Sequence, residues 1–205
     1  MINAFEKVYQ THTSANIPWN RNFPHFRLLD FLAEYEISPC AVLDVGCGLG
    51  TDSIYLARQG FDVSASDISQ TAIFEARLRA QEANVKIEFW VSSALKLPFK
   101  DENFDLIFDW RTFHCLLPPE QARYVNEISR VLKRGGGLLL AAFYLTGFHE
   151  EDRKILTEVF EKFPLNEEKM EQIFGIHFRI EFMRIFDMDD KSHCLGGMYY
   201  LINSK

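Results

Sequence analysis

Short apolar runs alternate with amphipathic segments between Cys40 and Phe143. Five of these runs have the length and apolar character of buried strands, and we predict strands at 41–45, 61–66, 86–91, 104–109 and 137–143. Helical periodicity predicts helices over 69–82, with Ser69 as N-cap, and over 120–133, where the glycines at 135–137 would stop the helix. Strands and helices in alternation are typical of βαβ units, so we expect an α/β fold with a mostly parallel, doubly wound sheet.

A glycine-rich turn follows the first of these strands. The chain there reads Val42-Leu43-Asp44-Val45-Gly46-Cys47-Gly48-Leu49-Gly50. Glycine leaves room for ligand atoms against the main chain and adopts positive φ without steric cost. Asp67 ends the next apolar run, where an acid can hold a ribose diol. The pattern predicts a nucleoside-bearing cofactor at the carboxyl edge of the sheet, unless the glycines only make a tight turn and Asp67 only caps a helix.

The two flanks have a different pattern. Residues 1–38 have one predicted helix, at 24–36, and carry Pro18, Trp19 and Pro24. After Phe143 a helical pattern is set by Leu156, Val159, Phe160 and Phe163, and a shorter one, capped by Asn166, turns Met170, Ile173 and Phe174 inward. The runs 177–186 and 197–203 are expected to pair antiparallel at the end of the sheet. We predict a single domain: a lid-like segment (1–38), a cofactor-binding core (39–145) and acceptor-side helices with closing strands (146–205).

Composition narrows the classes of function. The chain has 205 residues, of which 47% are hydrophobic and 25% charged, and a formal net charge of −7, which argues against a nucleic-acid partner. No apolar run reaches the roughly 18 residues of a membrane span, and the N-terminus lacks the pattern of a signal peptide. The cysteines form no CxxC pair, so we expect reduced thiols, no metal site and a cytoplasmic protein; they are Cys40, Cys47, Cys115 and Cys194.

The order of motifs over about 40–145 resembles that of class I S-adenosylmethionine-dependent methyltransferases, which have a Rossmann-like fold. The glycine turn is the first motif, and its GxGxG spacing differs from the GxGxxG of nicotinamide-binding proteins. Asp67 and Ile68 match the acidic block. The later blocks are Leu97-Pro98-Phe99, Phe104-Asp105-Leu106-Ile107 and Ile128-Ser129-Arg130-Val131-Leu132-Lys133-Arg134-Gly135-Gly136. The resemblance implies S-adenosylmethionine as cofactor.

A narrower resemblance points to one branch of that family. The segments Pro18-Trp19-Asn20, Asp109-Trp110-Arg111-Thr112-Phe113-His114, Pro118-Pro119 and Arg123-Tyr124 are similar to those of the thiol, thiopurine and tellurite-resistance methyltransferases. Enzymes of that branch act on small, soft nucleophiles. The sequence departs from the wider family at Ser93, where many members have an acid that contacts the adenine amine.

The resemblance also implies roles for the residues around the cofactor. Gly46, Gly48 and Gly50 would let the chain approach the methionine part, and Asp67 would bind the ribose. Ile68, Ala94 and Leu95 would enclose the adenine, with Ser93 offering one hydrogen bond. Asp44 would face the cofactor ammonium, and Asp109 is placed at the edge of the same crevice. Cys47 occupies a turn position where a small side chain is needed, which favours packing over reactivity.

Three further side chains are candidates for binding or chemistry. An indole attracts a sulfonium or ammonium, so Trp19 is predicted to close over the cofactor, or simply to pin the N-terminal segment to the core. His114 could take a proton from the acceptor, and Arg111 could attract an anionic acceptor. The plainer alternatives are a buried, hydrogen-bonded histidine and a surface ion pair.

These observations predict methyl transfer from S-adenosylmethionine to a small molecule, preferably a thiol-like or other soft nucleophile. One alternative is an O-, N- or C-methyltransferase of a larger apolar metabolite. Another is a cofactor-binding regulatory module without activity, which the serine at position 93 would suit. The oligomeric state cannot be predicted from this sequence.

Overall fold

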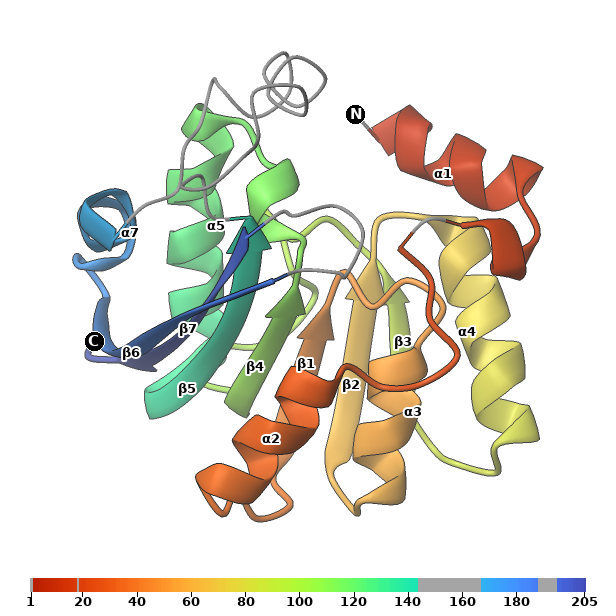
Figure 1. Cartoon of the computed structure of the whole chain (residues 1–205), viewed down its shortest axis with the longest axis horizontal. Helices are drawn as coiled ribbons and strands as arrows, with labels where there is room; N and C mark the ends of the chain where they lie inside the picture. The colour runs from red at the N-terminus through yellow and green to blue at the C-terminus, as the bar shows by residue number, and fades with distance from the viewer. Residues whose placement is uncertain (1, 18, 144–166, 188–194) are drawn as a thin grey trace.

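The computed structural model describes residues 2–17, 19–143, 167–187 and 195–205, and Figure 1 shows their arrangement. The strands are β1 (Ala41–Val45), β2 (Asp62–Asp67), β3 (Glu88–Val91), β4 (Phe104–Trp110), β5 (Leu132–Phe143), β6 (Phe178–Asp187) and β7 (Leu195–Asn203). The helices are α1 (Ile2–Thr11), α2 (Phe26–Glu34), α3 (Thr51–Arg58), α4 (Gln70–Glu82), α5 (Pro118–Val131) and α7 (Glu167–Phe174), with 3-10 turns at Ser14–Asn16 and Phe113–Cys115.

In the described residues, seven strands form one sheet in the order β3-β2-β1-β4-β5-β7-β6. The pairs from β3 to β5 are all parallel, whereas β7 runs antiparallel to both β5 and β6. This confirms the predicted Rossmann-like α/β fold with an antiparallel strand at its C-terminal end. The strand order reverses between β1 and β4, and such a switch point opens a ligand crevice at the carboxyl ends of the strands.

The sheet is covered on both faces, with α2, α3 and α4 on one side and α5 and α7 on the other (Figure 1). Alternation along β1 produces this layering. Val42 packs in the cluster that contains Leu28 and Phe31 of α2, while Leu43 packs with Ile128 of α5. A parallel strand that is buried on both faces needs apolar residues at consecutive positions, which is the pattern that predicted β1. The described helices include none that is both long and apolar enough to cross a membrane.

The prediction that the glycines at 135–137 stop a helix was wrong. The helix α5 ends at Val131, and β5 begins at the next residue, with a register shift where it pairs with β4. Gly135 has a φ of +75°, and a Cβ on Gly137 would lie 2.5 Å from the Tyr200 ring. The glycines therefore shape the irregular start of a strand and leave space for a β7 side chain.

The helices match the predictions in part. The helix α4 begins as expected, with the Ser69 hydroxyl accepting from the Ala72 N–H at 3.0 Å. The predicted 24–36 helix is α2, and α7 buries Met170 and Phe174. The helix α1 was not predicted. The pattern at 156–163, the Asn166 cap, Pro18 and Cys194 lie outside the described residues, and the proposed three-part organisation stays a prediction.

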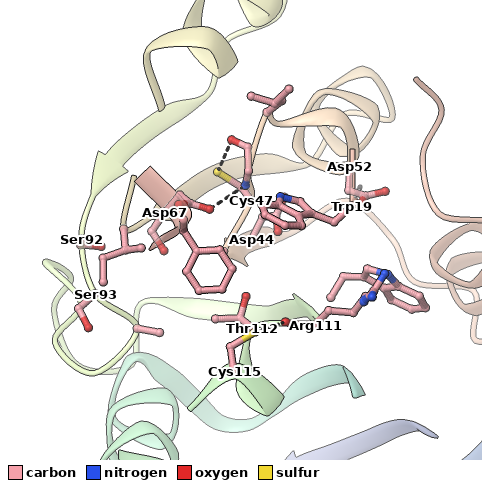
Figure 2. A pocket seen from close by; sticks show the side chains of 18 of the residues that line it. Trp19, Asp44, Cys47, Asp52, Asp67, Ser92, Ser93, Arg111, Thr112 and Cys115 are labelled. Atoms are coloured by element: carbon pink, nitrogen blue, oxygen red, sulfur yellow. Dashed lines mark hydrogen bonds between the residues drawn. The ribbon is translucent and has the colours of Figure 1, made fainter. Parts of the chain in front are cut away.

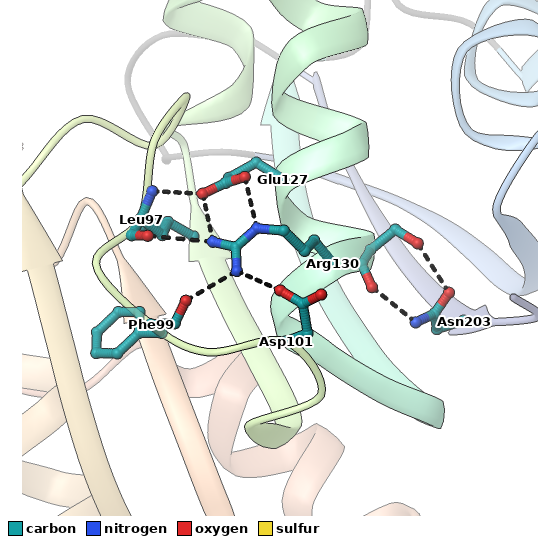
Figure 3. A network of polar contacts seen from close by, with 7 residues as sticks. Leu97, Phe99, Asp101, Glu127, Arg130 and Asn203 are labelled. Carbon is teal, nitrogen blue, oxygen red and sulfur yellow. Dashed lines mark hydrogen bonds and ion pairs between the residues drawn. The ribbon is translucent and has the colours of Figure 1, made fainter.

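A network around Arg130 joins α5 to the loop after β3 (Figure 3). Its Nη1 donates to the Phe99 carbonyl and to Asp101, both at 2.8 Å, and its Nη2 donates to the Leu97 carbonyl at 3.1 Å. Glu127 accepts from the Leu97 N–H at 2.6 Å and from Arg130 at 2.7 Å. Two sequence motifs that are distant along the chain, the Leu-Pro-Phe block and the end of α5, are thus held together.

Candidate functional site

A cavity of about 330 Å³ lies at the carboxyl edge of the sheet, at the switch point between β1 and β4. Its volume is at the lower end of the range for small-molecule sites. Figure 2 shows Asp67, Ser92 and Ser93 on one side of it, and Arg111, Thr112 and Cys115 along another wall. Twelve of the fourteen predicted site residues line it: Trp19, Asp44, Gly46, Cys47, Gly48, Asp67, Ile68, Ser93, Ala94, Leu95, Arg111 and His114.

The glycine turn adopts the backbone that its composition predicts. Gly46 has a φ of +72° and Gly48 a φ of +54°. The N–H groups of Gly46 and Cys47 donate to the Ser66 carbonyl at 2.7 and 3.0 Å, which ties the turn to β2. A Cβ on Gly46 would lie 1.8 Å from Thr112 Oγ1, so glycine at this position is required by packing as well as by φ.

Asp67 is held in place by backbone donors at the end of β2. Its Oδ2 accepts from the Gly48 N–H and its Oδ1 from the Ser69 N–H, each at 2.9 Å. Burial raises the pKa of Asp67, while these backbone hydrogen bonds act in the opposite direction. The carboxylate thus links the glycine turn to the start of α4 and lines the cavity at the place predicted for a ribose diol.

Asp44 is buried at the end of β1 and lies in the cavity wall. Its Oδ2 accepts from the Ser53 hydroxyl at 2.5 Å. Burial, and then the carboxylate of Asp52, raise the pKa of Asp44 to about 8. A nearby cation stabilises a buried carboxylate because it replaces the hydration that the carboxylate loses on burial. The predicted contact with an ammonium would supply such a cation.

An ion pair that the sequence reading missed lies beside the turn. Arg21 Nη2 is 3.2 Å from Asp52 Oδ2, and both residues line the cavity. Burial raises the pKa of Asp52 to about 6, and the Arg21 charge opposes this increase. The two residues are 31 positions apart and share no motif, so spacing along the chain does not indicate that they pair.

The part of the cavity predicted to hold the adenine consists of the predicted apolar residues and one serine loop. Ile68, Ala94 and Leu95 are partly buried and line the cavity. The Ser93 hydroxyl accepts from the Leu95 N–H at 3.2 Å, so the serine shapes its own turn as well as facing the cavity. This loop is the one that Arg130 fastens to α5.

The wall after β4 contains Arg111, His114 and Cys115. Arg111 has a φ of +78°, which is strained for a residue with a side chain, and its N–H donates to the Ala141 carbonyl at 2.9 Å. Burial, and then the nearby Arg111 charge, lower the pKa of His114 to about 3. Burial raises the pKa of Cys115 to about 11. The imidazole is therefore neutral and weakly basic at pH 7, and the thiol stays protonated.

The N-terminal segment covers part of the cavity. Trp19 Nε1 donates to the Tyr9 hydroxyl at 2.8 Å, and that hydroxyl lies 2.8 Å from where a Cβ on Gly48 would be. Glu6 of α1 accepts from the Ser69 and Thr71 hydroxyls at 2.5 and 2.6 Å, which docks α1 on the start of α4. The positions of these residues along the sequence do not indicate that they are in contact.

Two predicted site residues, Gly50 and Asp109, do not line the cavity. Gly50 precedes α3 with a φ of +76°, and a Cβ there would meet Ala76 at 3.1 Å. Asp109 is fully buried and accepts from the Tyr124 hydroxyl at 2.6 Å and from the Thr112 N–H at 2.7 Å. Both positions support the turn after their strand. In the described part of the chain, no cluster of three His, Cys, Asp or Glu side chains could hold a metal ion.

Comparison with known proteins agrees with this geometry. Residues 42–136 match the family model described as a methyltransferase domain. The methyltransferase GfsG of Streptomyces halstedii is 32% identical over 122 residues, which cover 58% of this chain and 43% of that protein. The chain thus spans less than half the length of this curated relative.

Solved structures share the fold at lower identity. The structure reported as "Conversion of a Disulfide Bond into a Thioacetal Group during Echinomycin Biosynthesis" has a TM-score of 0.81 at 23% identity, over 99% of this chain and 92% of that one. The 1,6-didemethyltoxoflavin-N1-methyltransferase of Burkholderia thailandensis, with bound S-adenosylhomocysteine, has a TM-score of 0.79 at 18% identity, over 100% and 87%.

Residues 42–136, slightly less than half of the chain, therefore resemble a methyltransferase domain, and one protein that shares the fold binds S-adenosylhomocysteine, so S-adenosylmethionine is the cofactor that the cavity is compared with. The described residues fit that cofactor: the glycine turn leaves the space that side chains would fill, a carboxylate ends β2 in the cavity, and a second buried carboxylate ends β1.

Proposed function

We propose that this protein transfers a methyl group from S-adenosylmethionine to a small molecule that is already a soft nucleophile, such as a thiol. The observation that carries the proposal is the environment of His114, the imidazole in the wall after β4. With a pKa of about 3, this side chain is a poor proton acceptor. An acceptor that ionises near neutral pH, as a thiol does at about 8.5, needs little help from a base.

When bound, the cofactor supplies an electrophilic methyl group on a sulfonium. The protein's contribution would be alignment and exclusion of water. Asp67 would hold the ribose, Asp44 would receive the ammonium, and the Trp19 indole would cover the site. The carboxylate oxygens of Asp52 accept from Arg21 and from the His25 N–H, so this acid is committed to the N-terminal segment.

The fold alone does not determine which acceptor is methylated. One structural neighbour is named for a disulfide-to-thioacetal conversion and another for methylation of a ring nitrogen. A larger apolar acceptor is the second candidate, favoured by the aromatic and aliphatic side chains in the cavity wall, among them Phe5, Tyr9, Trp110 and Leu116. Location in the cytoplasm and the absence of a nucleic-acid partner stay predictions from the sequence.

The pH dependence of turnover tests the proposal. For a panel of small thiols, kcat/KM should rise with pH and level off near the pKa of each thiol, and His114→Ala should change it by less than about tenfold, because the thiolate itself is the nucleophile. If the pH profile of kcat/KM showed the same apparent pKa for every thiol, and His114→Ala lowered kcat/KM by more than about 100-fold, the enzyme would use a general base. Tight binding of S-adenosylhomocysteine without turnover on thiols, phenols or amines would instead favour a regulatory module.

A further inference from the structure

Arg21 is a half-buried cation in the cavity wall, with 26% of its side chain exposed. It lies in the segment that connects the Ser14–Asn16 turn to α2. Its guanidinium carbon is 5.7 Å from the centre of the Trp110 ring, and its Nη2 contacts Asp52 at 3.2 Å. A planar guanidinium stacked on an indole and held by a carboxylate has little freedom to move away from the cavity.

The main chain around Arg21 is fastened to the first turn of α3. The Thr51 hydroxyl donates to the Arg21 carbonyl at 2.9 Å, and the His25 N–H donates to Asp52 Oδ1 at 2.7 Å. The His25 ring also lies against Trp110, with ring centres 3.4 Å apart. These contacts hold the guanidinium against Asp52, which Figure 2 shows on the opposite side of the cavity from Ser92 and Ser93.

Two opposite charges meet at this end of the cavity. Burial lowers the pKa of Arg21, and the carboxylates of Asp52 and Asp44 oppose that effect, so the guanidinium lies within electrostatic range of Asp44. The methionine end of the cofactor carries an ammonium and a carboxylate on the same carbon. A buried acid and a neighbouring guanidinium match these two groups, and Arg binds carboxylates through two parallel N–H bonds.

We propose that Arg21 binds the α-carboxylate of the cofactor, so that the site selects ligands with an intact amino-acid end. This inference rests on the proposed function only through the cofactor. Among the described residues that line the cavity, the second arginine is Arg111, which follows β4 and lies near His114. Arg21 is thus a binding residue that the motifs of residues 40–145 do not include.

Calorimetry with two ligands that differ in one group provides the test. The ligands are S-adenosylhomocysteine and its decarboxylated analogue, which keeps the adenosine, the thioether and the amine. The wild-type protein should prefer S-adenosylhomocysteine by about 10- to 100-fold, the range for hydrogen bonds between charged groups. Arg21→Gln should remove this preference by weakening S-adenosylhomocysteine alone, and Arg21→Lys should keep part of it, since it retains the charge but not the fork.

Arg27→Gln is the matched control, because Arg27 lies nearby on α2, outside the cavity, and loses the same charge. It should bind both ligands as the wild type does. Equal weakening of the two ligands in Arg21→Gln would overturn the proposal and leave Arg21 as a structural partner of Asp52. Equal wild-type affinities would overturn it even if Arg21→Gln did not fold. Failure of the wild type to bind S-adenosylhomocysteine at all would instead reject the cofactor assignment.

Discussion

At the scale of single residues, Asp44 is a buried acid in the cavity wall whose ionisation lowers the stability of the folded protein. Its carboxyl is buried and its pKa is raised from 3.8 to about 8. Because the pKa in the folded protein is above that of the unfolded chain, ionisation disfavours the folded state, and stability from this group falls as pH rises from about 4 to 8. A bound ammonium would stabilise the ionised form and offset that cost.

The affinity for S-adenosylhomocysteine should therefore increase between pH 6 and pH 8, as Asp44 loses its proton more readily. Calorimetry at pH 7 in buffers of different ionisation enthalpy should detect a proton released on binding. Asp44→Asn should bind S-adenosylhomocysteine more weakly and with a flatter pH dependence. At pH 8 its free energy of unfolding should nevertheless exceed that of the wild type by at least about 1 kcal/mol, which thermal unfolding would detect as a higher unfolding temperature. Binding without proton release would argue against an ammonium at Asp44.

Gly46 is constrained by a neighbour as well as by its own backbone. Gly46→Ala should destabilise the protein by at least about 2 kcal/mol, because the new methyl group overlaps Thr112 Oγ1 and the positive φ adds strain. Chemical denaturation would measure this loss. The double variant Gly46→Ala/Thr112→Ala should recover part of it, and purely additive effects would contradict the close contact.

At the scale of elements, the sequence predicted those whose pattern is local. The bounds of β1 were predicted correctly, and Ser69 was correctly identified as the cap of α4. The helix α1 has no acidic residue in its first turn, and its docking depends on Glu6 reaching Ser69 and Thr71, which are distant in the chain. The pair Arg21–Asp52 was missed for the same reason, since tertiary contacts carry it. The role of the glycines at 135–137 was predicted wrongly because glycine is typical both of a helix stop and of the irregular start of a strand.

Arg130 should control the order of the loop that is predicted to enclose the adenine. Arg130→Ala removes the bonds to the Leu97 and Phe99 carbonyls and to the Asp101 carboxylate, and leaves the two carbonyls dependent on water. We expect a loss of about 1–3 kcal/mol in stability and weaker cofactor binding. Arg134→Ala, which changes an exposed arginine of the same motif, is the control. Similar denaturation curves for the two variants would show that the network contributes little.

At the scale of the whole molecule, strand order locates the site. The reversal between β1 and β4 brings together the glycine turn, the acid of β2 and the wall after β4, and the sequence motifs were sufficient to predict that meeting. The acceptor could not be predicted in the same way. The part of the cavity left for the acceptor depends on how the turn with Arg111 and His114 lies in space, and no periodicity or spacing of the sequence encodes that.

The most direct measurement of the central claim follows the methyl group itself. The protein would be incubated with S-adenosylmethionine labelled with a trideuterated methyl group and a panel of small thiols, and the products analysed by mass spectrometry. The account predicts an S-methyl product that carries the three deuterium atoms, formed in equal amount with S-adenosylhomocysteine, and a Gly48→Val variant that forms neither. Labelled product only on oxygen, nitrogen or carbon acceptors, or none on any acceptor despite tight cofactor binding, would contradict it.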